Sequence, residues 1–284
     1  DLAGLTTTAV RDGDDWIVTG QKVWTSGAHV SDRGMLIART NWDVPKHRGI
    51  SYFILPMDQP GVEVRPLRQM NGAAHFSEVF LSEARVSHAD MIGPAGEGWR
   101  VATATLGYER RGLGAANVGG PRPVAGRLAN ELDRTVADIV GAHSRRSDGN
   151  EAAAAVGTAR RLRALAGEQG IRRVDRDRLA ALAARERVEP GAALRQPLAA
   201  KLAWTERLRA ASDVGSRIAG AQAMLAGDDG PGAFTGFMLS IPSASIAGGT
   251  DEVQRNILGE RALGMPREPA ADRDAPFREV PRNG

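Results

Sequence analysis

The amino-acid pattern changes near residue 95, and this change constrains the fold more than any other feature of the chain. Before it, short runs rich in β-branched and aromatic residues alternate with turn residues. Two of these runs, residues 6–10 and 16–19, flank an Asp/Gly turn as the strands of a hairpin do. From residue 98 onward, Leu, Ala, Arg and Glu recur at helical spacing. The sequence therefore predicts an α+β chain, with a small antiparallel β barrel or sandwich domain over residues 1–94 and an α-helical, four-helix-bundle-like domain over residues 95–265.

The boundaries within the second region follow from apolar spacing and from breaker residues. The spacing predicts helices at about residues 98–118, 121–143, 151–168, 174–187, 195–226 and 249–261. Residues 144–150 and the segment around Pro190 and Gly191 are predicted loops. Residues 266–284 are rich in Pro, Asp and Arg, which predicts an extended or disordered tail.

Composition narrows the possible functions. The formal net charge is only +3, which gives little reason to expect nucleic acid as a partner. The chain has no cysteine, so disulfides and thiolate chemistry are excluded, and its five histidines show no metal-ligand spacing. No apolar run approaches the roughly 20 residues that a membrane span needs, and a cytoplasmic setting is the default. The chain opens at Asp1 rather than Met, so we expect an amino-terminal segment to be missing.

Glu109 is the first candidate for chemistry. On the first predicted helix, Ala102, Leu106, Glu109 and Leu113 follow each other at spacings of four, three and four residues, which places them on one face. A carboxylate within an apolar stripe is desolvated, so its pKa rises and it becomes a better proton acceptor near neutral pH. The alternative is a glutamate at the edge of the stripe, paired with Arg110 or the arginine after it.

The second candidate segment is residues 247–255, AGGTDEVQR. Two glycines, Gly248 and Gly249, allow a backbone to approach a ligand closely, and Thr250 is suited to cap a following helix, whose first N–H groups favour an anionic or acceptor group. The alternative is plain helix capping with Glu252 exposed on the surface.

The third candidate segment is residues 21–27, QKVWTSG, which interrupts the β pattern. Trp24, Thr25 and Ser26 could present a flat ring and two hydroxyl groups to a flat cofactor. A tryptophan packed between sheet and helices is the alternative. Neither a Walker-type loop nor a Rossmann fingerprint is present in the sequence.

Taken together, several ordered segments resemble the acyl-CoA dehydrogenase family over most of the chain. They are residues 1–9 (DLAGLTTTA), 20–27 (GQKVWTSG), 76–81 (FSEVFL) and 246–261 (IAGGTDEVQRNILGER). The resemblance implies an amino-terminal helical lobe, which is missing here, a β middle domain and a carboxy-terminal four-helix bundle. It also implies FAD as cofactor, with Trp24 packed on the isoalloxazine ring, Thr25 and Ser26 hydrogen-bonded to its edge, and Thr250 and Glu252 near the adenosine portion.

The implied reaction removes hydrogen across Cα–Cβ of an acyl-CoA, with a carboxylate taking the α-proton while flavin accepts the β-hydride. Well-studied family members carry this base where the present sequence has Gly248. A second arrangement in the family places it on the first bundle helix in a Glu-Arg pair, which Glu109 and Arg110 match. The resemblance thus implies Glu109 as base, Arg110 and Gly248 beside the substrate, an electron-transfer flavoprotein as acceptor, and a homo- or hetero-oligomer, dimeric or tetrameric.

Two alternatives share this fold. Gly248, and the absence of a recognisable Arg-x-x-Phe-Gly segment, are compatible with a non-catalytic subunit that completes a partner's flavin site. An acyl-CoA oxidase, which passes electrons to oxygen, is the other.

Overall fold

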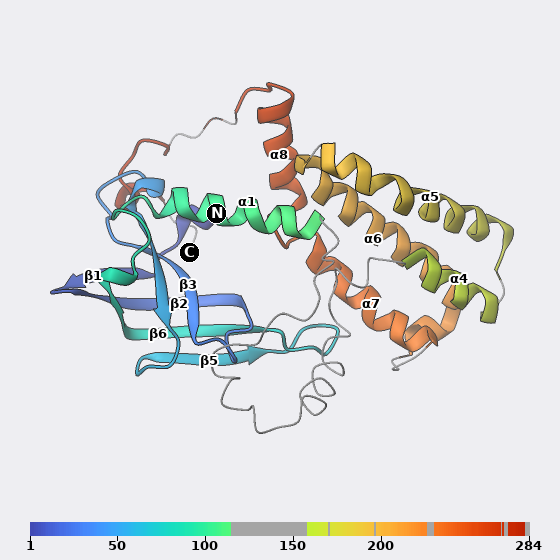
Figure 1. Cartoon of the computed structure of the whole chain (residues 1–284), viewed down its shortest axis with the longest axis horizontal. Coiled ribbons are helices and arrows are strands. Elements are labelled where there is room, and N and C mark those ends of the chain that lie inside the picture. Colours follow the sequence, from blue (N-terminus) through green and yellow to red (C-terminus); the bar gives the residue numbers. More distant parts are fainter. Residues whose placement is uncertain are drawn as a thin grey trace. The chain divides into compact units, whose positions relative to one another are not determined.

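The computed structural model describes residues 1–114, 158–169, 171–195, 197–225, 230–267, 269 and 272–281 (Figure 1). These residues form two compact units. The first contains residues 1–107 and the described residues from 269 onward, and the second contains the described residues from 108 to 267. The division falls inside one helix, α1 (Gly98–Gly114). The predicted helix over residues 121–143, and residues 115–118 and 151–157 of two others, lie outside the described residues, as does the predicted loop 144–150.

A six-stranded sheet is the framework of the first unit. Its strands are β1 (Thr8–Asp12), β2 (Asp15–Ser26), β3 (Arg33–Arg39), β4 (Ile50–Pro56), β5 (Val62–Leu67) and β6 (Phe76–Ser87). They are arranged in the order β4-β3-β1-β2-β6-β5. The predicted class, a β domain followed by helices, is confirmed. One neighbouring pair, β1 and β3, is parallel rather than antiparallel, and sequence could not predict this because the two strands meet only at Thr8 and Arg39.

The core of this unit comes from alternation along the strands. Trp16 and Val18 on β2 are buried, and β6 buries every second residue over most of its length. The ring of Trp16 packs edge-on against Phe53 of β4, with ring centroids 5.6 Å apart. Burial of one face of each strand fixes the register of the sheet, since a slip by one residue would turn the apolar face to solvent.

The second unit is a set of helices built around one central helix. They are α4 (Thr158–Gln169), α5 (Arg173–Arg195), α6 (Pro197–Ala219), α7 (Gly230–Ala244) and α8 (Asp251–Ala262), with a 3₁₀ turn η6 (Gly220–Met224) after α6. α6 packs against each of α4, α5, α7 and α8. Leu162, Leu179, Val214 and Ile218 belong to the largest buried apolar cluster of this unit.

Two local predictions in this unit were wrong. The predicted loop around Pro190 does not form, because α5 continues to Arg195; proline fixes φ near the helical value and removes one hydrogen bond without necessarily ending the helix. α7 was not predicted because its sequence, GPGAFTGFMLSIPSA, is rich in glycine and proline. Packing overrides this low propensity, since Ile241 and Ala244 are buried beside α6.

The first unit also contains three short 3₁₀ turns: η1 (Leu2–Gly4) before β1, η2 (Lys46–Gly49) between β3 and β4, and η3 (His88–Asp90) after β6. A further one, η7 (Phe277–Glu279), lies in the C-terminal segment and packs on the β domain, where Phe277 is buried. This contact was not expected from the sequence, which predicts an extended or disordered tail.

Candidate functional site

The end of β2 carries an unusual backbone at Trp24. The pairing of β2 with β6 loses its regular register between Lys22 and Thr25, so Trp24 lies at an irregularity of the β-bulge kind. Its φ is +59°, a left-handed conformation that costs a bulky residue about 1–3 kcal/mol. The side chain is 61% exposed, and the ring touches the edge of Phe76 at a centroid distance of 5.9 Å. A strained backbone that holds a large apolar ring out of the core is a feature of functional sites.

The hydroxyl groups of Thr25 and Ser26 follow directly. Thr25 lies opposite Ser77 of β6, and Ser26 lies opposite Phe76. Gly27 closes the strand in a left-handed turn, with φ at +63°, and its N–H donates to the carbonyl oxygen of His75 at 3.0 Å. Trp24, Thr25 and Ser26, which the family resemblance assigns to the isoalloxazine, are thus consecutive residues at the end of β2, and their flavin role remains a prediction.

Lys22 is a neighbouring charged group that sequence reasoning did not single out. It pairs with Val79, a core residue of β6, and is half-buried. Burial lowers the pKa of Lys22 to about 8. Within the described part of the chain the ammonium group of Lys22 makes no ion pair that would offset this effect of burial.

The start of α1 is fixed tightly on β4. A side-chain carbon at Gly98 would lie 2.4 Å from the carbonyl carbon of Ser51, so only glycine permits this approach. The N–H of Gly96 donates to the Ser51 hydroxyl at 3.0 Å, and that hydroxyl also shares a hydrogen bond with Thr40. The helix therefore begins at a backbone position defined by the sheet.

Glu109 and Arg110 lie in the backbone of α1, but their side chains are outside the described residues. The helix is continuous from Gly98 to Gly114, so Ala102, Leu106 and Glu109 share one face, as the spacing predicts. Ala102 is buried and Leu106 is half-buried. The burial and pKa of Glu109 remain predictions.

The turn between α7 and α8 contains the second group of candidates. Gly248 is buried, and Gly248 and Gly249 have φ values of +66° and +91°, which residues with side chains rarely adopt. Thr250 caps α8, its hydroxyl accepting a hydrogen bond from the N–H of Val253 at 3.2 Å. Glu252 is exposed, and its ion pair with Arg255 is long, at 4.0 Å between nitrogen and oxygen. The predicted cap is present, while the ligand role of Thr250 and Glu252 remains a prediction.

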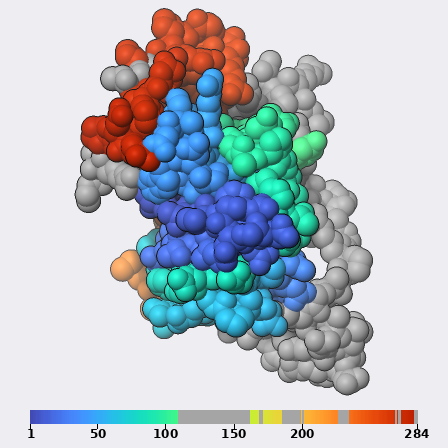
Figure 2. Space-filling view, turned by 90° about the vertical axis from the view of Figure 1, so that its left-hand side faces the viewer, coloured from blue at the N-terminus to red at the C-terminus, as the bar shows by residue number. Residues whose placement is uncertain are grey.

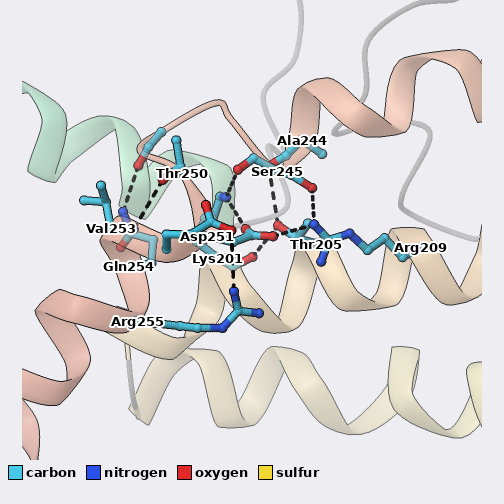
Figure 3. Close-up of polar contacts among 12 residues, drawn as sticks. Lys201, Thr205, Arg209, Ala244, Ser245, Thr250, Asp251, Val253, Gln254 and Arg255 are labelled. Atoms are coloured by element: carbon cyan, nitrogen blue, oxygen red, sulfur yellow. Dashed lines mark hydrogen bonds and ion pairs between the residues drawn. The ribbon is translucent and has the colours of Figure 1, made fainter. Parts of the chain in front are cut away.

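Charged residues missed by sequence reasoning hold this turn (Figure 3). Lys201 of α6 and Asp251 at the start of α8 form an ion pair of 2.5 Å, with side chains only 1% and 2% exposed. Lys201 also donates to the carbonyl oxygen of Ser245, the residue directly after α7, at 3.2 Å. Arg209 pairs with the second carboxylate oxygen of Asp251 at 2.8 Å and donates to the Ser245 hydroxyl at 2.6 Å.

This network ties both ends of the turn to α6. Buried charges are costly unless they are paired and hydrogen-bonded; here both carboxylate oxygens of Asp251 are ion-paired, and Oδ1 is also hydrogen-bonded to Lys201. Burial alone would raise the pKa of Asp251, but the hydrogen bond and charge of Lys201, with the charge of Arg209, outweigh it and hold the pKa below its ordinary value. Gln254, also buried, donates from its side chain to the Gly248 carbonyl at 3.1 Å. The glycine turn is thereby rigid although its own residues are small.

No group of three or more His, Asp or Glu side chains in the described ranges is placed to hold a metal ion. None of the described helices combines the length and the apolar character that crossing a bilayer requires.

Comparisons with known proteins match both units. Residues 1–84 match the family model "Acyl-CoA dehydrogenase, middle domain", and residues 96–263 match "Acyl-CoA dehydrogenase, C-terminal domain". The chain is 37% identical over 268 residues to acyl-CoA dehydrogenase IpdE1 of Mycobacterium tuberculosis, covering 94% of this chain and 64% of that protein. It is 33% identical to IpdE1 of Mycolicibacterium smegmatis, covering 94% and 65%. The chain therefore spans about two-thirds of the length of these relatives.

Solved structures agree on the fold. The ChsE4–ChsE5 complex from Mycobacterium tuberculosis matches with a TM-score of 0.71 at 29% identity, over 94% of this chain and 66% of that one. The Tcur3481–Tcur3483 steroid ACAD matches with a TM-score of 0.69 at 27% identity, over 94% and 65%. Since its two units match the middle and C-terminal domain models in order, the chain belongs to the acyl-CoA dehydrogenase family, and its cofactor is accordingly a flavin.

Proposed function

We propose that the protein to which this chain belongs dehydrogenates an acyl-CoA thioester at Cα–Cβ with FAD as cofactor, and that Glu109 removes the α-proton. The reaction requires a base beside the α-carbon, a hydride acceptor beside the β-carbon, and donors that stabilise negative charge developing on the thioester oxygen.

The observation that carries the assignment of the base is the state of the carboxylates in the glycine turn. Position 248 has no side chain. Asp251 is buried in ion pairs with Lys201 and Arg209, and Glu252 points to solvent. In residues 245–254 no carboxylate is therefore both buried and free to take a proton. Glu109, on the α1 face that it shares with buried Ala102, supplies one from another part of the backbone.

The residues at the end of β2 fit a flavin. The exposed ring of Trp24, held out by a strained backbone, offers a flat apolar surface, and the hydroxyl groups of Thr25 and Ser26 can donate to the edge of a planar ring system. When bound, the flavin supplies the acceptor for the β-hydride. In this proposal Thr250 and Glu252 lie near the adenosine portion.

The glycine turn serves the substrate in this proposal. With no side chain at Gly248, the thioester can approach the backbone closely. Arg110 lies beside the substrate, as in the family's Glu-Arg arrangement. Glu109 then accepts the α-proton on its carboxylate oxygen.

The test is Glu109→Gln in the full-length protein. Glutamine keeps the size of the side chain but cannot accept the proton, so we expect anaerobic bleaching of the flavin by substrate to slow by about 100- to 10,000-fold. Glu63→Gln, at an exposed position of β5 that has no role in the proposed site, is the matched control and should bleach at the wild-type rate. Unchanged bleaching by Glu109→Gln would show that the base lies elsewhere.

A hetero-oligomer is the assembly we propose. The similar structures, the ChsE4–ChsE5 complex and the Tcur3481–Tcur3483 steroid ACAD, each carry the names of two proteins, and Gly248 is compatible with a subunit that contributes to a partner's site. Purification of the full-length protein alone, with stoichiometric flavin and turnover, would exclude the requirement for a partner.

We propose that the electron acceptor is an electron-transfer flavoprotein and that the reaction takes place in the cytoplasm. Oxygen consumption without an added acceptor would instead favour an oxidase.

For the acyl group, the likeness to a structure described as a steroid ACAD favours a bulky, steroid-like thioester over a straight fatty chain. Turnover by the full-length protein with CoA esters of both types separates the two possibilities. A higher kcat/KM for straight-chain esters would reject the steroid-like assignment.

A further inference from the structure

The C-terminal residues 272–280, which we call the C-terminal strap, occupy a specific seat on the β domain. Phe277 is 3% exposed and packs against Trp42 with ring centroids 5.4 Å apart. The N–H of Phe277 donates to the carbonyl of Val44 at 3.0 Å, and that of Arg278 donates to the carbonyl of Trp42 at 3.1 Å. In Figure 2 the dark red C-terminal atoms lie directly against blue atoms of the β domain. Both family models end before the strap, at residues 84 and 263.

Charge reinforces the seat. The guanidinium carbon of Arg39 lies 3.5 Å from the centroid of the Phe277 ring, a cation–π arrangement, and Arg39 is fully buried. Arg278 pairs with Asp43 at 2.5 Å, and Asp272 pairs with Lys46 at 3.4 Å. These contacts are side-chain specific, so the strap is recognised by more than general hydrophobicity.

Arg39 connects the strap to two other segments. Its guanidinium donates to the carbonyl oxygens of Ala3 and Leu5 in the amino-terminal segment, at 2.6 and 3.1 Å. It also donates to the carbonyl of Lys46, the first residue of η2, at 3.0 Å. Loss of the strap would expose the face of Arg39 that Phe277 covers and remove the backbone partners of the segment before η2.

The segment on which the strap lies supports the start of α1. His47, in η2, packs against Trp99 in the first turn of α1, with ring centroids 4.8 Å apart. Burial, and then the positive charges of Lys46 and Arg39, lower the pKa of His47, so its ring is neutral at neutral pH. Ile50, the residue directly after η2, forms a β-bridge with Glu97, one residue before the helix.

We propose that the C-terminal strap is a positioning element: by seating Phe277 on Arg39 and Trp42 it fixes residues 41–49, and through His47 and Trp99 it sets the first turn of α1. The inference rests on the proposed function only for its consequence in catalysis, because α1 carries Glu109. Phe277 is accordingly a positioning residue that touches no reacting atom.

The test removes the strap and returns it in trans. The full-length protein is ended after Met265, and a synthetic peptide of residues 266–281 is added. Hydrogen–deuterium exchange is followed in residues 41–49 and 98–102. We expect truncation to speed exchange in both segments by about tenfold or more, as loss of a well-buried aromatic contact predicts, and the peptide to restore slow exchange. A peptide with Phe277→Ala should fail to restore it.

Matched variants in the intact chain separate a positioning role from general stabilisation. Phe277→Ala should speed exchange in residues 41–49 and 98–102, leave the β1–β2 hairpin unchanged, and lower the limiting rate of flavin reduction severalfold. Arg273→Gln, at an exposed strap position, should change none of these. If exchange rose only within the strap, the proposal would be overturned. If exchange at α1 became faster while the rate of flavin reduction stayed unchanged, the strap would still position the helix but would have no effect on catalysis. This result does not depend on whether Glu109→Gln is inactive.

Discussion

The two candidate regions, the end of β2 and the turn between α7 and α8, reach a defined geometry by opposite means. At Trp24 an exposed ring is held by a backbone in a left-handed conformation, at an interruption of the strand pairing. At Gly248 the left-handed conformation costs nothing, since the residue is glycine, and buried charges from α6 fix the turn from outside. Strain therefore marks the first region, and charge pairing behind small residues marks the second.

Lys201→Met removes the central ion pair of the turn between α7 and α8, and we expect it to have the largest effect on stability. It leaves the buried Asp251 with only Arg209 as an ion-pair partner, so the unfolding free energy should fall by about 3–5 kcal/mol, as for other buried pairs that lose one member. Urea denaturation of the full-length protein measures this. Lys201→Arg, which keeps the charge, should retain more stability, and Arg217→Gln, which removes only an exposed pair with Asp213, should cost about 0.5 kcal/mol or less. If Lys201→Met lowered the unfolding free energy by no more than Arg217→Gln does, the structural role of the Lys201–Asp251 pair would be contradicted.

The pH dependence of stability sharpens the same point. Because the folded pKa of Asp251 is depressed, the folded state binds fewer protons there than the unfolded chain. The stability that Asp251 contributes is therefore fully present above its unfolded pKa, about 3.9, and is lost as the pH falls through the folded value. The difference in unfolding free energy between wild type and Asp251→Asn should be constant from pH 6 to 5 and shrink below about pH 4. A difference that persists unchanged at pH 3 would exclude this linkage.

Trp24→Gly tests the strained region and has a smaller expected effect on stability. Glycine relieves the left-handed strain, which stabilises the folded apoprotein, and this gain exceeds the opposing cost of the greater conformational entropy of glycine in the unfolded chain. We therefore expect the apoprotein to become more stable by about 1 kcal/mol. Flavin retention should fall because the tryptophan ring is gone. Thermal unfolding of the apoprotein and the flavin-to-protein absorbance ratio measure the two effects. Glu83→Gly is the control, since Glu83 has a similar φ of +57° elsewhere on the sheet and should gain stability without losing flavin. Equal flavin loss in both variants would remove the special role of Trp24.

The features that could be predicted from the sequence are those determined by residues close together in the chain. The change of pattern near residue 95 located the β and helical regions, and the cap at Thr250 follows from residue type alone. The Lys201–Asp251 pair joins residues fifty positions apart, and nothing in either local sequence indicates its partner. The seat of Phe277 is likewise non-local, since its contacts with Trp42 and Arg39 connect opposite ends of the chain.

The strained Trp24 shows a different limit. Its segment was identified as irregular, but the left-handed φ depends on the register of β2 against β6, which only the assembled sheet defines. Similarly, α7 is helical in spite of its sequence because packing against α6 outweighs propensity. Local patterns predicted the β and helical regions and the cap, whereas tertiary pairing determined α7, the strain, the charge network and the strap.

The measurement that tests the central claim most directly is exchange of the α-hydrogen of a bound acyl-CoA with solvent deuterium. It isolates proton removal from hydride transfer and is followed by mass spectrometry of the recovered thioester with the full-length protein. With Glu109 as the base, we expect rapid exchange with wild type and with Glu63→Gln, an exposed β5 position, and loss of exchange with Glu109→Gln. Exchange at the wild-type rate in Glu109→Gln would contradict Glu109 as the base.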